Sequence, residues 1–203
     1  VSPLSAQPSE ARLAAADTYL QSRARLGQFN GSVLIAKKGA VLFAKSYGES
    51  DFSTHTPNTS QTRYAVASLT KMFTAGAILA LQEEGRLHVS DRLCKWVLPC
   101  PAAWTNITLD HLLHHTSGIK DYEAPLDLGS AQYQRFMAAP QSARRIVDAA
   151  RTQRLEFEPG TRFGYSNTGY VLLGQVIERA SRMSYERYVT VRLLRRAGMS
   201  GAL

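Results

Sequence analysis

Ser68 and Lys71 are a pair whose residue types and spacing could carry out covalent chemistry. Residues three positions apart on an α-helix lie on one face, so the Lys71 ammonium can reach the Ser68 hydroxyl. Serine is a weak nucleophile unless a neighbouring base takes its proton, and a lysine one turn along could serve. Backbone N–H groups at a helix start would stabilise the oxyanion formed when serine attacks a carbonyl. The motif is short, however, so Ser68 as a helix cap and Lys71 as a solvated lysine form the alternative.

Tyr165 and Asn167 form a second pair, placed between a Pro159-Gly160 turn and a predicted helix. Two positions apart in a loop, their side chains can project to the same side. A phenol can act as general acid or base. A carboxamide can accept a hydrogen bond from a lysine and donate one to a substrate carbonyl. The alternative is an ordinary turn with an aromatic residue followed by a helix cap.

Three histidines, His111, His114 and His115, suggest a metal site because positions i, i+3 and i+4 share a helical face. No glutamate completes an H-E-x-x-H pattern, and the ligand set is incomplete. We therefore favour a structural role for these histidines, with a metal protein centred on them as the rival hypothesis.

The two cysteines, Cys94 and Cys100, lie six positions apart on either side of Pro99. No C-x-x-C pair is present, which argues against a zinc site. In an oxidising compartment the cysteines could close a small loop, and in a reducing one they would be two buried thiols. Bridging depends on geometry, so the sequence leaves both states open.

The elements that must position these residues begin with a helix that Ser9 caps and Gly27 ends. Two apolar runs, residues 31–37 and 40–45, flank a Lys38-Gly39 turn and predict a β-hairpin. The polar residues 46–62 predict a loop. An extended segment, residues 63–67, leads to a helix that starts at Ser68 and stops at Gly85. That helix is predicted to be largely buried through its apolar residues, Met72, Phe73, Ala75, Ile78, Leu79 and Leu81.

The rest of the chain predicts short helices and loops and no strong strand. Ser90-Asp91 can cap a turn that runs through Val97, and Thr108 can cap a helix that runs to His114. Further helices are expected over residues 130–138, 141–154, 166–182 and 184–196. A two-stranded ribbon alone is only marginally stable, so the hairpin should pair with strands that this chain does not provide.

Composition bounds the class of protein. The chain has 203 residues, of which 44% are hydrophobic and 20% charged, with a net charge of +8. No apolar run is long enough to span a bilayer. The arginines are scattered and no basic tract is interleaved with aromatics, so nucleic-acid binding is not expected. Residues 1–8 predict a disordered leader that resembles what remains after a secretory signal is removed, which favours a periplasmic or secreted location.

Together these motifs resemble the penicillin-recognising serine hydrolases, in the β-lactamase-like branch of class C β-lactamases, D-alanyl-D-alanine carboxypeptidases and related esterases. The wider superfamily carries S-x-x-K and, where this chain has Tyr165-Ser166-Asn167, S-D-N. The resemblance extends from about Gly31 to Met199. Its connecting stretches are Gly31-Ser32-Val33-Leu34, Leu109-Asp110-His111-Leu112-Leu113-His114-His115-Thr116-Ser117-Gly118-Ile119 and Glu158-Pro159-Gly160.

The resemblance implies an α/β (α+β) fold, in which an antiparallel sheet flanked by helices adjoins a mostly helical subdomain. It implies that Ser68 is the acylated nucleophile, with its backbone N–H as one oxyanion donor, and that Lys71 is its proton partner. Tyr165 would be the general acid or base, and Asn167 would hold Lys71 and the substrate amide. The His-Thr-Ser-Gly segment would be a structural turn near the active site. No metal or cofactor is implied, the substrate would be a small molecule or peptide, and the oligomeric state stays open.

The family's third motif, a Lys or His, a small residue and Gly on a sheet strand, is not found after Asn167. We therefore expect the chain to be the N-terminal portion of a larger enzyme whose C-terminal strands are missing. Its expected organisation is a leader (1–8), a helix and hairpin of the α/β lobe (9–62) and a nucleophile helix with the helical lobe (63–203). The predicted function is hydrolysis of an amide or ester, such as a β-lactam, a D-amino-acid peptide or a small ester, through an acyl-enzyme on Ser68. The alternative is a non-catalytic binding or assembly module on the same scaffold.

Overall fold

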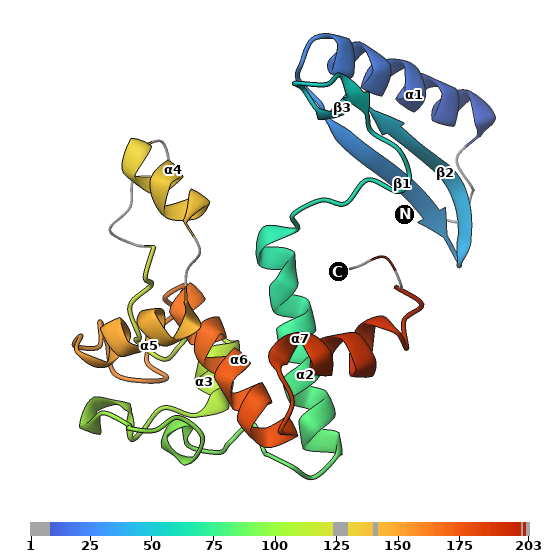
Figure 1. Cartoon of the computed structure of the whole chain (residues 1–203). Helices are drawn as coiled ribbons and strands as arrows, with labels where there is room; N and C mark the ends of the chain where they lie inside the picture. The colour runs from blue at the N-terminus through green and yellow to red at the C-terminus, as the bar shows by residue number, and fades with distance from the viewer. Residues whose placement is uncertain (1–8, 124–129, 140–141, 200, 202–203) are drawn as a thin grey trace. The chain divides into compact units, whose positions relative to one another are not determined.

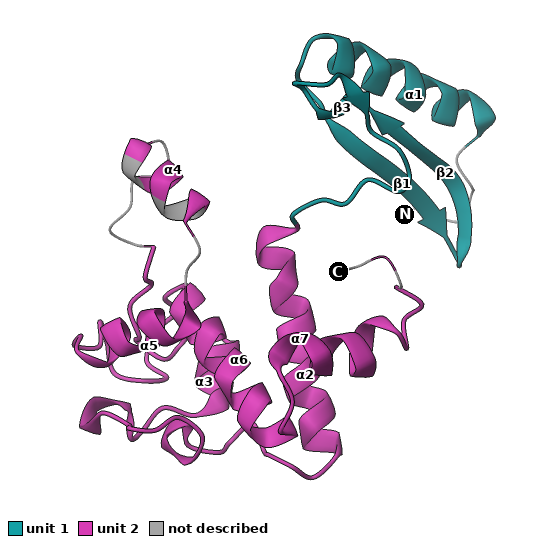
Figure 2. Cartoon of the chain, in the orientation of Figure 1, with its two compact units in different colours: residues 1–65 teal, residues 66–203 magenta. Residues whose placement is uncertain are grey.

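The computed structural model describes residues 9–123, 130–139, 142–199 and 201, and the expected leader lies outside these ranges (Figure 1). The chain divides into two compact units, Val1–Ala65 and Val66–Leu203 (Figure 2). Each unit has its own internal organisation. The first holds a helix and two small antiparallel sheets, and the second is mostly helical.

The first unit opens with α1 (Glu10–Arg25), whose N-terminus is capped by Ser9 through a bond from the Arg12 backbone N–H. Strand β1 (Gly31–Lys37) then pairs antiparallel with β2 (Ala40–Tyr47). Lys38 and Gly39 both have positive φ, at 50° and 80°, as a tight two-residue hairpin turn requires. The predicted capped helix and hairpin are therefore confirmed.

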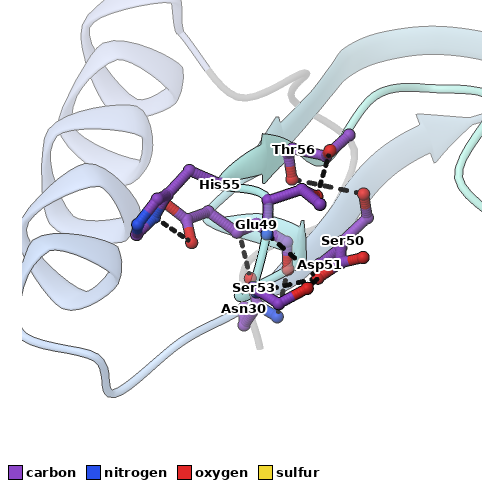
Figure 3. Close-up of polar contacts among 8 residues, drawn as sticks. Asn30, Glu49, Ser50, Asp51, Ser53, His55 and Thr56 are labelled. Atoms are coloured by element: carbon purple, nitrogen blue, oxygen red, sulfur yellow. Dashed lines mark hydrogen bonds and ion pairs between the residues drawn. The ribbon is translucent and has the colours of Figure 1, made fainter.

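The prediction that residues 46–62 form only a loop was wrong. Strand β2 runs on to Tyr47, and β3 (Glu49–Asp51) pairs with β4 (Thr56–Pro57) in a second small sheet. The connection is a side-chain turn, in which Asp51 Oδ1 accepts from the Ser53 and Thr54 backbone N–H groups at 2.8 and 3.3 Å (Figure 3). Aspartate commonly nucleates such turns, so the polar composition of residues 46–62 is compatible with a hairpin as well as with a loop.

Hydrogen bonds of the Asn30 and Asn58 side chains stabilise the corner between β2 and β3. Asn30 Oδ1 accepts from the Glu49 backbone N–H at 2.8 Å and from Asn58 Nδ2 at 2.9 Å. Asn58, which is buried, also donates to the Tyr47 carbonyl at 2.9 Å and accepts from Tyr64 Oη at 3.0 Å. At this corner Gly48 has φ of 73°, and a Cβ there would lie 2.1 Å from Asn30 Oδ1. Glycine is therefore required for the chain to pass so close to the network.

The second unit is built around two helices, α2 (Thr70–Glu83) and α6 (Asn167–Ser181), which pack against each other. The other α-helices are α3 (Leu109–Leu113), α4 (Ala131–Ala138), α5 (Ala143–Arg151) and α7 (Tyr185–Val189). Single turns of 3₁₀-helix lie at η1 (Ala67–Leu69), η2 (Leu93–Lys95) and η3 (Ala102–Trp104), and α7 continues into a π-turn, η4 (Thr190–Leu194). The α-helices match those predicted from the sequence to within a few residues, whereas η3 was not predicted. Gln141, the expected start of α5, lies outside the described ranges.

The core of this unit lies between α2, α6 and the segments that cross them. Ile78 and Leu81 of α2 are fully buried, as are Leu172, Leu173, Val176 and Ile177 of α6, and Trp104 lies in the same cluster. The prediction that α2 is largely buried holds for one face only, because Met72 is 63% exposed and Leu79 49% exposed. The helix is amphipathic rather than buried all round, and it begins at Thr70 after the 3₁₀ turn that contains Ser68.

Cys94 and Cys100 form a disulfide, with their Cα atoms 5.3 Å apart, which settles the alternative that the sequence left open. The loop between them is attached to two helices. Arg151 of α5 donates to the Leu98 carbonyl at 3.1 Å, and Arg179 of α6 donates to the Trp96 carbonyl at 3.3 Å.

Within the described ranges, no strand follows β4, and the second unit contains one isolated bridge, between Arg92 and Thr108. This agrees with the expectation that further strands of the sheet are not part of this chain. Across the same ranges, every helix is too short or too polar to cross a lipid bilayer.

Candidate active site

The Ser68 hydroxyl does not cap a helix. Five other serine or threonine side chains at helix starts accept from the backbone N–H three residues on: Ser9, Thr108, Ser142, Ser166 and Ser184. Neither η1, which contains Ser68, nor α2, which follows it, has a side-chain cap. The structure therefore excludes the interpretation of Ser68 as an N-cap.

Two titratable side chains surround the Ser68 hydroxyl instead. Its Oγ lies 2.7 Å from Tyr165 Oη, at the start of α6, and accepts from Lys71 Nζ at 3.2 Å. Ser68 and Tyr165 are both exposed, so the hydroxyl is open to an incoming group. The arrangement joins the serine hydroxyl to a phenol and an amine, each of which can accept its proton when it is itself deprotonated.

The Lys71 ammonium is held by hydrogen bonds to protein side chains rather than left in solvent. Its Nζ donates to Asn167 Oδ1 at 2.6 Å as well as to Ser68 Oγ. The ammonium also lies 4.9 Å from the ring centre of Tyr165 and 5.4 Å from that of Tyr170, within cation–π range. The four residues predicted from the sequence, Ser68, Lys71, Tyr165 and Asn167, therefore lie in one connected group.

The two tyrosines near Lys71 have different surroundings. Burial, and to a lesser extent the nearby Tyr165, raise the pKa of Tyr170 above its usual value. The Tyr170 hydroxyl donates to the Leu113 carbonyl at 3.1 Å. Tyr170 is thus held as a neutral structural phenol, and Tyr165 is the one whose oxygen reaches Ser68.

The backbone is bent directly before the serine. Ala67 has φ of 44°, a left-handed conformation that is unusual for a residue with a side chain. Strained conformations of this kind cost on the order of 1–3 kcal/mol and are concentrated at functional sites. This independent observation supports Ser68 as part of a functional centre.

His115 contacts both Tyr165 and the residue that follows it. Its ring stacks on the Tyr165 ring at 4.5 Å, and its Nδ1 accepts from the Ser166 backbone N–H at 3.1 Å. Burial first, and then the Lys71 charge, lower the pKa of His115, against a smaller opposing effect of Asp121. A neutral ring is what the contact with Ser166 requires, because a protonated imidazole has no acceptor nitrogen.

Asp121 is the site residue that the sequence analysis missed. Its Oδ1 accepts from the Asn167 backbone N–H at 3.2 Å, and its Oδ2 accepts from Asn167 Nδ2 at 3.1 Å. Asp121 lies two positions beyond the matched stretch that ends at Ile119. A lone aspartate in a loop has no sequence signature, so that proximity was the one available signal.

With this geometry established, the family can be assigned. The sequence model of the Beta-lactamase family matches residues 15–202. The chain belongs to the Beta-lactamase family. The resemblance seen in the motifs and the fold expected from it are thereby confirmed.

Known relatives agree with this assignment. Penicillin-binding protein 4* of Bacillus subtilis is 36% identical over 185 residues, which cover 90% of this chain and 40% of that protein. Among solved structures, an octameric penicillin-binding protein homologue from Pyrococcus abyssi has a TM-score of 0.76 at 32% identity, over 95% of this chain and 44% of that one. A D-amino acid amidase from Ochrobactrum anthropi has a TM-score of 0.77 at 25% identity, over 92% and 50%. The chain thus spans about half or less of the length of these β-lactamase-like relatives.

The other two histidines of the family stretch have separate structural contacts. His111 completes a capping box at α3, its Nδ1 accepting from the Thr108 backbone N–H at 3.3 Å. His114 pairs with Asp110 at 3.1 Å. Where the structure describes the chain, no three His, Cys, Asp or Glu side chains gather as metal ligands. The rival metal hypothesis therefore has no assembled site in this part of the chain.

Proposed function

We propose that this Beta-lactamase family chain carries the nucleophile of a serine hydrolase, which forms an acyl-enzyme on Ser68. The observation that carries the proposal is the position of Ser68 Oγ, within hydrogen-bond distance of Tyr165 Oη and Lys71 Nζ and free of any capping role. A buried structural serine would bond to backbone groups instead.

In the proposed reaction, the Tyr165–Lys71 pair acts after losing one proton, as a phenolate beside an ammonium or as a phenol beside an amine. Ser68 Oγ then attacks a carbonyl carbon while its own proton passes to this pair. The new C–O bond gives a tetrahedral oxyanion, for which the Ser68 backbone N–H is one donor. Collapse of the oxyanion breaks the bond to the leaving group, which takes the proton from the same pair. Water then attacks the ester carbonyl and gives a proton to the same pair. The bond between the acyl carbon and Ser68 Oγ breaks, the acid product leaves, and Oγ takes the proton back. Lys71 and Tyr165 act as a coupled pair, with no first acceptor assigned.

The Lys71 ammonium has an electrostatic role in this proposal. Its Nζ lies 3.2 Å from Ser68 Oγ, where negative charge develops as the hydroxyl loses its proton. A fixed charge aimed at a developing anion lowers the barrier without reorganisation. Asn167 Oδ1 keeps the ammonium in place at 2.6 Å and leaves the amide close enough to meet a substrate.

The proposed substrates are amides or esters: a β-lactam, a D-amino-acid peptide or a small ester. The names of the relatives, a penicillin-binding protein and a D-amino acid amidase, support this range. In the resembling family the second oxyanion donor lies on a sheet strand, and none of the strands described in this chain follows Asn167. One such donor is worth about a hundred- to a thousand-fold in rate, so we expect full turnover to need that strand.

A periplasmic or secreted location belongs to the same proposal. The Cys94–Cys100 disulfide supports it, because such bonds persist mainly in oxidising compartments. Cell fractionation with thiol labelling tests this point, and a cytosolic pool with both thiols free would contradict it.

The second candidate is a non-catalytic binding or assembly module on the same scaffold. The observation in its favour is the lack of any described strand after β4 that could complete an oxyanion hole. The alternative predicts an inert Ser68, whereas the hydrolase proposal predicts a reactive one.

Intact-mass spectrometry after incubation with a fluorophosphonate separates the two candidates. We expect the purified protein to gain the mass of one probe and the Ser68→Ala variant to gain none. Circular dichroism of both proteins checks that they are equally folded. Equal labelling of the two, or no labelling of the folded protein, would contradict the hydrolase proposal.

A further inference from the structure

Asp121 contacts Asn167 of the proposed centre and has no described contact with Ser68. It lies in the segment after α3 and is half-buried. Its carboxylate accepts two hydrogen bonds from Asn167, one from the backbone N–H at 3.2 Å and one from Nδ2 at 3.1 Å. The Glu123 backbone N–H also donates to Oδ1, at 3.4 Å. Every polar contact described for this carboxylate is therefore made as an acceptor.

The chemistry of the four groups gives the network a direction. An ionised carboxylate only accepts hydrogen bonds, and an ammonium only donates them. An amide between the two must turn its NH₂ toward the carboxylate and its oxygen toward the ammonium. The observed order is Asp121, then Asn167, then Lys71 with Nζ 2.6 Å from Asn167 Oδ1, and then Ser68. An amide turned over would place two donors against each other at Lys71.

We infer that Asp121 is a positioning residue, which fixes the Asn167 amide so that its oxygen holds Lys71 against Ser68. The inference rests on the proposed function, because it assigns a role within the same centre. Asp121 acts through Asn167 and does not contact the reacting atoms.

A purely structural role for Asp121 is the competing explanation. Its bond to the Asn167 backbone N–H places a negative charge at the first residue of α6, which would stabilise the helix in its own right. Ser166 already caps this helix end through the Gly169 N–H at 3.1 Å. A helix-end role alone predicts a loss of stability with no specific effect on the amide or on acylation.

The test compares Asp121→Asn, which keeps the shape of the side chain, with Asp110→Asn, which removes one charge on α3. Asp110 pairs with His114 and has no described contact with Asn167. Fluorophosphonate labelling rates and melting temperatures are measured for both. We expect Asp121→Asn to slow labelling on the order of 10- to 100-fold, the range found for residues that orient the metal ligands of metalloproteins. We expect Asp110→Asn to leave the rate unchanged.

A double-mutant cycle with Asn167→Ala separates positioning from helix stabilisation. If Asp121 acts through the amide, Asp121→Asn slows labelling no further once Asn167 is alanine. An additive loss of labelling in the double variant, matching the loss of stability, would overturn the inference.

Hydrogen exchange of the Asn167 side-chain NH₂ gives a readout that needs no activity. In ¹⁵N-labelled protein we expect Asp121→Asn to speed this exchange, while Asp110→Asn leaves it unchanged. Faster exchange in a protein that takes up no probe would contradict the proposed function and still support the positioning role. Unchanged exchange in Asp121→Asn would overturn the positioning role, even in a protein that is labelled at Ser68.

Discussion

Two serines precede the two central helices of the second unit, and their hydroxyls have opposite roles. Ser166 is 1% exposed, and its hydroxyl accepts a hydrogen bond from the Gly169 backbone N–H at the start of α6. Ser68 is exposed, lies before α2 and directs its hydroxyl to Tyr165 and Lys71. Both lie where an irregular segment meets an apolar helix, and the local difference between them is the residue three positions on, Lys71 after Ser68 and Gly169 after Ser166.

A reactive serine differs from a structural one in the partners of its hydroxyl. A hydroxyl bonded to a backbone N–H stabilises a helix and has no proton acceptor nearby. A hydroxyl bonded to a phenol and an ammonium can exchange its proton. The two helix starts also depend on each other, because the segment that Ser166 caps carries Tyr165 and Asn167 toward Ser68.

The largest effect short of removing Ser68 is expected for Lys71→Ala. The substitution removes the charge and the bonds to Ser68 and Asn167, so we expect the labelling rate to fall about a thousand-fold or more, in the range of acid–base catalysis. The side chain is only partly buried, and the melting temperature should change little. Stopped-flow or timed mass spectrometry measures the rate, and a near-normal rate would remove Lys71 from the proposed centre.

Tyr165→Phe is expected to slow labelling on the order of a hundred-fold, because it removes the oxygen at Ser68 while keeping the ring stacked on His115. Tyr170→Phe is the matched control, since it deletes a hydroxyl that bonds to the Leu113 carbonyl instead. We expect the control to lose about 1 kcal/mol of stability, by leaving that carbonyl without its donor, with a far smaller loss of rate. Equal rate losses in the two variants would contradict the separate roles of the tyrosines.

Ser166→Ala should have the reverse outcome of Ser68→Ala. Loss of an N-cap costs about 1 kcal/mol, which lowers the melting temperature of a chain of this length by roughly 2–4 °C. Labelling at Ser68 should continue, whereas Ser68→Ala should abolish labelling at an unchanged melting temperature. Calorimetry with intact-mass measurement checks both, and a Ser68→Ala variant as destabilised as Ser166→Ala would erase the distinction between the serines.

The smallest expected effect is on the pH dependence of stability. The folded protein lowers the pKa of His115 through burial and through Lys71. The unfolded chain then binds the proton first as pH falls, so this contribution to stability is complete above about pH 6.5 and decreases below it. His115→Asn removes the titration, keeps an acceptor for the Ser166 N–H and tolerates the φ of 57°. Melting temperatures between pH 7 and 5 should fall more steeply in the unsubstituted protein, and parallel curves would contradict the assignment.

Local chemistry made much of the fold predictable. The caps Ser9 and Thr108 marked helix starts correctly, and Lys38-Gly39 located the hairpin turn. What failed depended on distant contacts. The β3–β4 hairpin is held by Asn30 and Asn58, which lie 28 positions apart, and no local pattern reveals their pairing. The exposed face of α2 also carries apolar side chains, so its sequence led us to predict more burial than the helix has.

In the candidate site too, local pairs could be predicted from the sequence and distant ones could not. Ser68 and Lys71 are related by helical spacing and could be paired from sequence, whereas Ser68 and Tyr165 lie 97 positions apart and were joined through the family resemblance alone. Asp121 reaches Asn167 across 46 positions, and neither spacing nor motif pointed to it.

Peptide mapping of the fluorophosphonate-labelled protein shows directly which serine reacts. We expect the probe on Ser68 alone, with Ser166 unmodified in the same digest. Labelling of Ser166 or of another residue in the folded protein, with Ser68 unmodified, would contradict it.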